Sequence, residues 1–293
     1  MGAEILALIP GRVSVSADPR LGNSYDGIVN KGLSLMTLFD EMNIPRHRVL
    51  IKIPATWDGI RAAQTLEHDY DIRTNLTLVF SLVQALACAQ AGVSVISPFI
   101  GRVKDWWHAK MIAAGRLEGL EKQPLSEHPG IHLVRRIRSA FRANGYATEV
   151  MAAGFRKPEE VLELVQGGRR RGPDLVTIPP DLLEGLRRIP GIQDNVLEEN
   201  FGLTESSVAY FDEQGPVDGG YESFERDMVA EEIGVEKVPE GLAKFSADAD
   251  KLEERVGLAL VNLESSYRSP RSPHLSYRQK DSSKKSPTIS VEV

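Results

Sequence analysis

Val49-Leu50-Ile51-Lys52-Ile53-Pro54 is an apolar run, typical of a buried strand, in which a single side chain carries a charge. Branched aliphatic neighbours disfavour an ammonium group, so we expect the pKa of Lys52 to lie below its ordinary value. A lysine that is partly neutral is the nucleophile that Schiff-base chemistry requires. The alternative is an interior lysine that forms a structural ion pair with a carboxylate, and this run leaves both interpretations open.

Short runs rich in β-branched residues recur along the chain, each followed by a stretch with apolar residues three and four positions apart. The predicted strands are residues 12–17, 48–53, 73–79, 93–97, 148–152 and 175–178. Strands that alternate with helices pair in parallel through right-handed crossovers, which leaves an open doubly wound sheet or a TIM-type (β/α)8 barrel. No strand is followed by a glycine-rich dinucleotide fingerprint or a P-loop, which disfavours the doubly wound sheet. A closed barrel needs two strands more than these six.

Composition narrows the class of function. The chain has 293 residues, 42% of them hydrophobic, a net charge of -6 and a pI near 5.6, which favours a small-molecule substrate over nucleic acid or an anionic membrane. One cysteine, Cys88, excludes an internal disulfide and fits a reducing compartment. We find neither a signal peptide nor a long apolar run, so we expect a cytoplasmic location and no membrane span.

The end of the chain predicts a long helix and a tail. The helix is expected to start at Pro239 and to pack across the domain through apolar residues spaced three and four apart. These residues are Leu242, Phe245, Ala249, Leu252, Val256, Ala259 and Leu263. After about residue 265 the composition becomes basic and rich in Ser and Pro, so we expect a folded domain over 1–265 and a disordered tail over 266–293.

Polar side chains at strand ends indicate where a site forms. Asn75 and Thr77 alternate with leucines, so they share one face of their strand, where they can orient a water or a substrate hydroxyl beside the lysine, or satisfy each other in the core. Arg102 and Arg156 each lie in a turn just after a strand. Two guanidinium groups at the same end of a barrel suit a sugar phosphate, although each taken singly is typical of a surface ion pair.

These features occur together in segments that resemble the transaldolase family in order and in spacing. The segments are GRVS (11–14), LIKIPATWDGIRAA (50–63), NLTLVFS (75–81), SPFIGR (97–102) and DW (105–106). The resemblance covers about residues 2–260 and includes the final helix. It implies a TIM-type barrel enzyme of the pentose phosphate pathway that needs no metal and no organic cofactor.

The resemblance also implies a reaction and a set of site residues. The family moves a dihydroxyacetone unit from sedoheptulose 7-phosphate to glyceraldehyde 3-phosphate, which gives fructose 6-phosphate and erythrose 4-phosphate, and Lys52 matches its Schiff-base position. Asn75 and Thr77 match the pair that positions substrate and catalytic water. The remaining matches are Ser14, Ser97 and Phe99 as pocket-lining residues and Arg102 and Arg156 as the phosphate clamp. A homodimer is left open.

The chain departs from the family at three places. Ser16 stands where the family has its acid/base glutamate, and Gly154 where it has a phosphate-binding serine. The resemblance also begins after the family's first two strands, which carry an aspartate base and a substrate-binding asparagine. We therefore expect about six βα units with two open sheet edges.

Three explanations fit these departures: a coding sequence that lacks its 5′ part, a truncated paralogue that has lost the reaction, and a diverged enzyme in which Asp18 supplies the carboxylate. Relatives carry an aspartate at position 18 as well. The predicted function is a transaldolase-like transferase with reduced or lost activity. The alternative is a non-catalytic paralogue that binds sugar phosphates or a protein partner.

Overall fold

The computed structural model describes the backbone of residues 1–116, 123–165, 172–189 and 208–268, and side chains in these ranges as far as Val261. The chain divides into two compact units, Met1–Ala249 and Asp250–Val293. The predicted tail lies mostly outside the described residues, so the boundary at residue 265 stays a prediction. None of the helices in the described ranges has the length and the hydropathy that a membrane span requires.

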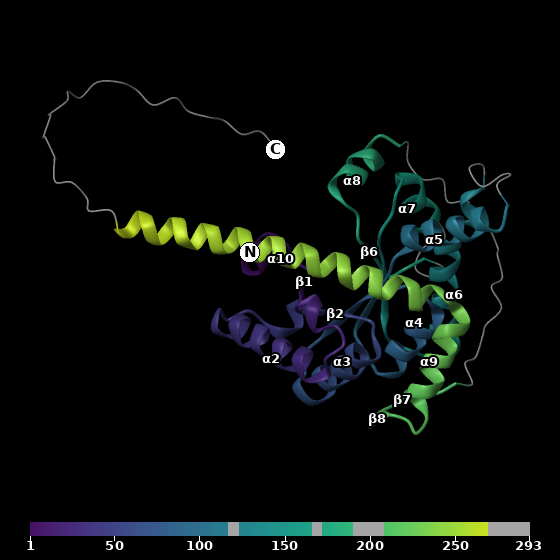
Figure 1. Cartoon of the computed structure of the whole chain (residues 1–293), viewed down its shortest axis with the longest axis horizontal. Helices are drawn as coiled ribbons and strands as arrows, with labels where there is room; N and C mark the ends of the chain where they lie inside the picture. The colour runs from purple at the N-terminus through teal and green to yellow at the C-terminus, as the bar shows by residue number, and fades with distance from the viewer. Residues whose placement is uncertain (117–122, 166–171, 190–207, 269–293) are drawn as a thin grey trace, which may run out of the picture. The chain divides into compact units, whose positions relative to one another are not determined.

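The first unit is built on a six-stranded parallel sheet whose strands follow one another in chain order (Figure 1). The strands are β1 (Val13–Ser16), β2 (Val49–Pro54), β3 (Thr74–Val79), β4 (Val95–Pro98), β5 (Glu149–Ala152) and β6 (Leu175–Val176). All six predicted strands are confirmed. The last is shorter than predicted, because prolines 179 and 180 follow closely and have no N–H for a sheet ladder.

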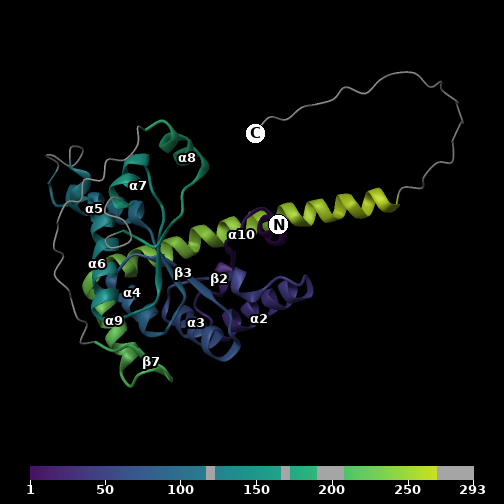
Figure 2. The same cartoon turned by 180° about the vertical axis from the view of Figure 1, so that it is seen from behind.

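Helices follow the strands and cover the outer face of the sheet, and Figures 1 and 2 show α2, α3, α4 and α6 in turn along it. The main helices are α2 (Tyr25–Glu41), α3 (Trp57–Tyr70), α4 (Leu82–Gln90), α5 (Ile100–Ala113), α6 (Pro129–Ala143), α7 (Pro158–Val165), α8 (Pro180–Arg187), α9 (Gly220–Glu231) and α10 (Ile233–Arg268). A short helix α1 (Gly2–Leu8) precedes β1, and an antiparallel hairpin of β7 (Phe211–Asp212) and β8 (Gly215–Pro216) precedes α9.

The sheet is a curled half-barrel with two open edges. Among the described strands, β1 pairs only with β2, and β6 pairs only with β5. The open edge at β1 is reflected in its burial. Ser14 and Ser16 are exposed, although they stand in register with residues of β2. The predicted truncated TIM-type fold is therefore confirmed.

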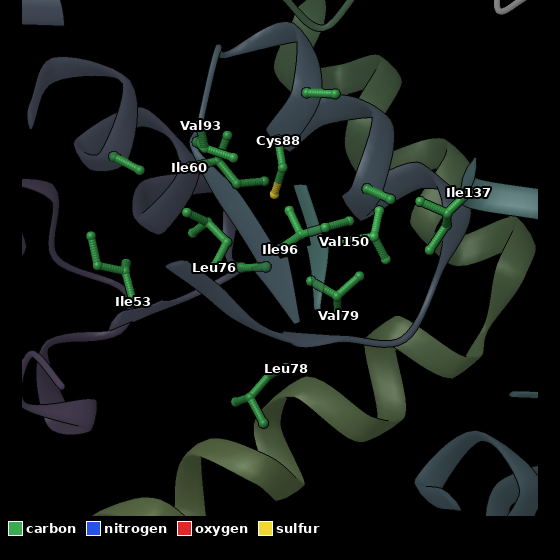
Figure 3. Packing of buried hydrophobic residues seen from close by; sticks show 14 of the residues in the cluster. Ile53, Ile60, Leu76, Leu78, Val79, Cys88, Val93, Ile96, Ile137 and Val150 are labelled. Atoms are coloured by element: carbon green, nitrogen blue, oxygen red, sulfur yellow. The ribbon is translucent and has the colours of Figure 1, made fainter. Parts of the chain in front are cut away.

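The core lies between the outer face of the sheet and the helices (Figure 3). Ile53, Leu76 and Ile96 project from successive strands toward α3 and α4 and are fully buried. Side chains alternate between the two faces of a strand, so Lys52 beside Ile53 and Asn75 beside Leu76 project to the inner face.

One strand of this core is irregular. Leu78 in β3 has a φ of 60°, and the pairing of β3 with β4 shifts register between Leu76 and Val79. This β-bulge turns the Leu78 side chain away from its neighbours and toward α10, where Figure 3 shows it apart from the rest of the cluster.

The long C-terminal helix starts earlier than predicted. It begins at Ile233, and Pro239 lies inside it rather than at its first position. Ile233 and Val238 are buried, so packing of this first turn sustains the helix across the proline, which removes one backbone hydrogen bond. The predicted packing holds for Leu242 and Phe245, whereas Leu252, in the second unit, is 62% exposed.

Candidate active site on the inner face of the sheet

Lys52 lies on β2 between the strands that carry its predicted partners. In the sheet register it stands next to Ser16 on β1 and next to Asn75 on β3. Burial lowers the pKa of the Lys52 amine below its ordinary value of 10.5. No described residue forms a hydrogen bond or an ion pair with its Nζ, so the structural ion pair considered above has no support within the described part of the chain.

A chain of hydrogen bonds runs across the inner face beside this lysine. The Asn75 side chain is fully buried, and its Nδ2 donates to Ser14 Oγ at 3.1 Å. The hydroxyl of Ser97 on β4 donates to Asn75 Oδ1 at 2.7 Å. Three predicted site residues from β1, β3 and β4 therefore form one network, in which both polar ends of the Asn75 amide have a hydroxyl partner.

Thr77 differs from Asn75, because its hydroxyl has no protein partner among the described residues. The residue is 3% exposed, and the buried Oγ1 makes no hydrogen bond. Asn75 and Thr77 thus do not form a hydrogen bond with each other, so the interpretation that they satisfy each other in the core is wrong. A buried hydroxyl without a partner is available to a ligand atom on the inner face.

The backbone just after Thr77 is held by a glutamine that sequence reasoning missed. Gln84 on α4 is fully buried, and its Nε2 donates to the carbonyl oxygens of Ala55 and Leu78 at 2.8 and 3.0 Å. Its Oε1 accepts from Phe80 N at 2.9 Å. One side chain therefore joins the ends of β2 and β3 and supports Leu78, the left-handed residue within β3, a contact that no local sequence pattern reveals.

Arg102 lies in the first turn of α5, directly after the loop that follows β4. Its Nη2 donates to Glu240 Oε1 on α10 at 3.0 Å, and its guanidinium lies 5.1 Å from the centroid of Phe80. Phe99, the predicted pocket wall, is in turn 6.0 Å from Phe80 between ring centroids. Hydrogen bonds from Lys237 and Lys244, and that from Arg102, lower the pKa of Glu240 to about 2, so it is a carboxylate at neutral pH.

Arg156 lies in the loop between β5 and α7 and close to the start of α5. Its Nη2 donates to Asp105 Oδ2 at 2.8 Å, and its side chain is 47% exposed. A Cβ placed on Gly101 would lie 3.1 Å from Arg156 Cγ, so the stem of this arginine runs against the helix that carries Arg102. The structure thus brings the loop of Arg156 against the first turn of α5, which carries Arg102, and each arginine binds a carboxylate of the chain itself.

Among the described residues, no carboxylate occupies a register position beside Lys52. Ser16 occupies the register position beside Lys52. Asp18 is fixed by Arg20, which contacts it through its backbone N–H, Nε and Nη2, and the hydrogen bond from the Arg20 side chain lowers the pKa of Asp18. Asp18 is therefore an ionised group held by a neighbouring cation, which makes it a poor proton acceptor.

Within the described ranges, no three His, Cys, Asp or Glu side chains gather as a metal site requires. The inner face offers an amine whose pKa is lowered by burial, an amide held by two serines, and the unpartnered hydroxyl of Thr77.

The family model and the similar sequences indicate the same family. Residues 1–256 match the family model described as transaldolase/fructose-6-phosphate aldolase. A transaldolase of Prochlorococcus marinus (strain NATL1A) is 39% identical over 271 residues, which cover 90% of this chain and 73% of the relative. A transaldolase of strain MIT 9211 of that species is 41% identical over 255 residues, which cover 87% and 69%. A solved mandelate oxidase mutant aligns with a TM-score of 0.35 and 15% identity over 60% of this chain and 50% of its own, a similarity too low to bear on the fold.

Proposed function

The chain belongs to the transaldolase/fructose-6-phosphate aldolase family, and from this premise we propose that it acts on sugar phosphates through a Schiff base on Lys52. The observation that carries the proposal is the state of that lysine: its pKa is lowered by burial, and no described carboxylate pairs with it. It also stands in register with the buried amide of Asn75. We place the reaction in the cytoplasm, in keeping with a single buried cysteine.

The proposed reaction begins with attack of the neutral Lys52 amine on the ketose carbonyl. Loss of one water gives an iminium, which withdraws electrons from the adjacent carbon atoms. The neighbouring carbon–carbon bond then breaks: the proton of the departing hydroxyl goes to a base, an aldehyde leaves, and the electron pair forms an enamine on Lys52. Addition of the enamine to a second aldehyde and hydrolysis of the iminium return the amine.

The other residues supply position rather than electrons. Asn75, oriented by Ser14 and Ser97, offers an amide to the sugar hydroxyls, and the unpartnered hydroxyl of Thr77 offers a contact for the substrate or a water. Arg102 and Arg156 bind the phosphate group in exchange for their carboxylate partners.

We propose that the reaction is slow in this chain. The proton of the departing hydroxyl needs a base close to the iminium, and Ser16 cannot accept it at neutral pH. Because Asp18 is held by Arg20, solvent has to take up the proton. General acid/base catalysis typically raises a rate about a hundredfold or more. We expect the activity of this chain to be lower by such a factor than that of an enzyme with a carboxylate at position 16.

Trapping with borohydride tests the proposal. After incubation with fructose 6-phosphate and borohydride, we expect peptide mass spectrometry to find a three-carbon adduct on Lys52 and none in the variant Lys52→Met. Lys110 is the matched internal control, because hydrogen bonds from its amine to Glu236 and Glu232 raise its pKa. An adduct on Lys110 as readily as on Lys52, or no adduct on either, would contradict the proposal.

A second candidate is a non-catalytic binder of sugar phosphates, and the absence of a carboxylate beside Lys52 in the described structure favours it. It predicts that fructose 6-phosphate binds and that Lys52 stays unmodified after borohydride. The trapping experiment therefore distinguishes the two candidates directly.

A further inference from the structure

Glu160 is a buried carboxylate that the proposed reaction does not use. It is the third residue of α7, and its side chain is fully buried. Burying a carboxylate is unfavourable unless several donors surround it, so the contacts of Glu160 indicate what it holds in place.

One oxygen of Glu160 binds the loop that carries Arg156. Its Oε2 accepts from the backbone N–H of Arg156 at 2.7 Å and from that of Lys157 at 3.3 Å. This is half of a capping box, in which a glutamate at the third helical position reaches back to the N-cap, and Pro158 occupies the favoured first position.

The other oxygen binds the two neighbouring helices. Glu160 Oε1 lies 3.2 Å from Lys104 Nζ on α5 and 3.5 Å from His128 Nε2. His128 is the N-cap of α6, where its Nδ1 accepts from Gly130 N and Ile131 N, and this leaves Nε2 as the ring atom that faces the carboxylate. One carboxylate therefore joins α5, α6 and α7 at the loop of Arg156.

The arginine is fixed at three points along its length. Glu160 holds its backbone N–H, the start of α5 at Gly101 lies against its stem, and Asp105 binds its guanidinium. The side chain is 47% exposed, so a phosphate would meet an accessible group whose backbone is already placed.

We propose that Glu160 is a positioning residue for anion binding: it holds the Arg156 loop against α5, so that Arg156 and Arg102 meet the same phosphate group. This inference rests on the proposed function, because it assigns Arg156 to the phosphate of the substrate. Glu160 itself touches no substrate atom.

The sign of one measurement separates positioning from simple charge. Removal of a negative charge near an arginine should strengthen anion binding if only electrostatics acts. If Glu160 instead positions the Arg156 loop through its hydrogen bond to Arg156 N, loss of that bond should weaken anion binding. The variant Glu160→Gln removes the charge and leaves one acceptor oxygen, so it can no longer serve both the Arg156 loop and Lys104. Glu163→Gln is the matched control, since Glu163 lies on the same helix and pairs with Arg135.

The experiment is a titration of the full chain with inorganic phosphate, followed by phosphorus NMR. We expect Glu160→Gln to weaken phosphate binding about tenfold, the factor that the loss of one charged hydrogen bond corresponds to, and Glu163→Gln to leave it unchanged. Binding that is equal or tighter in Glu160→Gln overturns the proposal, as does a wild-type chain that binds no phosphate.

A second variant covers the case in which Glu160→Gln does not fold. His128→Asn keeps a good N-cap for α6 and removes the imidazole contact to Glu160, so it should weaken phosphate binding in the same direction by a smaller factor. Unchanged binding in a folded His128→Asn variant counts against the proposal.

Borohydride trapping adds a readout that a purely structural role would not move. In Glu160→Gln the concentration of fructose 6-phosphate that gives half-maximal trapping should rise, while trapping of unphosphorylated dihydroxyacetone should stay at the wild-type level. Equal losses for both sugars overturn the proposal. A wild-type chain that traps neither sugar but binds phosphate refutes the Lys52 chemistry and leaves the phosphate titration as the test of Glu160.

Discussion

At the scale of single residues, Lys52 and its two register neighbours, Ser16 and Asn75, determine which steps of the proposed reaction the site can support. The lysine lacks a described counter-ion, Asn75 is held by serines on two other strands, and Ser16 is too weak a base for the proton transfer. The same burial that makes the amine nucleophilic also disfavours the folded state whenever the amine is charged.

Replacement of Lys52 by methionine should therefore stabilise the protein while it abolishes trapping. The pKa of Lys52 is lower in the folded chain than the ordinary 10.5 of the unfolded chain, so between these two values the unfolded chain binds more protons. The unfolding free energy of the wild type thus rises with pH in that window, and the full penalty is present below it. At pH 7 we expect Lys52→Met to gain about 1 kcal/mol, a usual size when a functional polar group is replaced.

Denaturant unfolding of both proteins at neutral pH and near pH 10.5 checks this. The gain should shrink as the pH rises. Lys110→Met is the control of opposite sign, because the carboxylates around Lys110 raise its pKa and favour the charged form. A Lys52→Met variant less stable than the wild type at pH 7 would contradict the prediction.

Ser16 is the second residue with a clear expectation. A glutamate at this position would stand in register beside Lys52 and could accept the proton of the departing hydroxyl. We expect Ser16→Glu to raise the rate of sugar transfer about a hundredfold, the low end of general-base effects, and Ser16→Gln, which has the same size without the charge, to give no gain. A coupled assay of transfer to erythrose 4-phosphate measures the rates, and equal rates for the two variants would refute the idea.

At the scale of elements, the contact between β3 and α10 determines how Arg102 is held. The bulge at Leu78 turns its side chain toward the helix, and Gly241 is the residue that it meets. A Cβ on Gly241 would lie 2.6 Å from Leu78 Cδ2 and 3.0 Å from Arg102 Nη1. Glu240, one residue earlier, binds the same arginine, so this turn of α10 fixes Arg102 by shape and by charge.

Substitution of two glycines of α10 tests that close approach. Gly241→Ala should lower the unfolding free energy by about 1–3 kcal/mol, the usual effect of overpacking. Gly257→Ala, in the same helix, should raise helix stability by up to about 1 kcal/mol, because no described atom lies within 4 Å of the added methyl group. Circular dichroism during denaturant unfolding measures both, and a stabilising Gly241→Ala would show that the approach is looser than described.

At the scale of the whole first unit, the open half-barrel depends on contacts between its layers. Gln84 joins the ends of β2 and β3, and Glu160 joins α5, α6 and α7. Such contacts matter more here than in a closed barrel, because the described sheet leaves β1 and β6 without a second partner strand.

Acid should weaken this unit through Glu160. Against the desolvation that raises it, the hydrogen bonds from His128 and Arg156 N lower the pKa of Glu160 from 4.5 to about 2. The folded chain thus holds the carboxylate ionised where the unfolded chain protonates it, so the stabilisation present above pH 4.5 is lost as the pH falls to about 2. We expect the wild type to lose a few kcal/mol of unfolding free energy over this range and Glu160→Gln to lose less. Parallel acid-unfolding curves for the two proteins would contradict this assignment.

The sequence by itself determined the six strands, because hydrophobic periodicity is a local property, but that periodicity did not predict the bulge that turns Leu78 toward α10. It placed Lys52 inside β2 and Asn75 with Thr77 on one face, and the resemblance to a family added Ser14, Ser97, Phe99 and the two arginines as candidates. It did not determine where α10 begins, since Pro239 is a helix-start signal that packing of Ile233 and Val238 overrides.

Only the tertiary structure decided which partner each candidate has. Asn75 contacts Ser14 across 61 positions, and Arg102 contacts Glu240 across 138, distances in sequence at which no spacing rule applies. The carboxylate of Glu160 has a local signal as a helix cap, but its contacts with Lys104 and His128 exist because three helices converge on one loop. Long-range partners depend on how the chain closes in space, and periodicity carries no information about that closure.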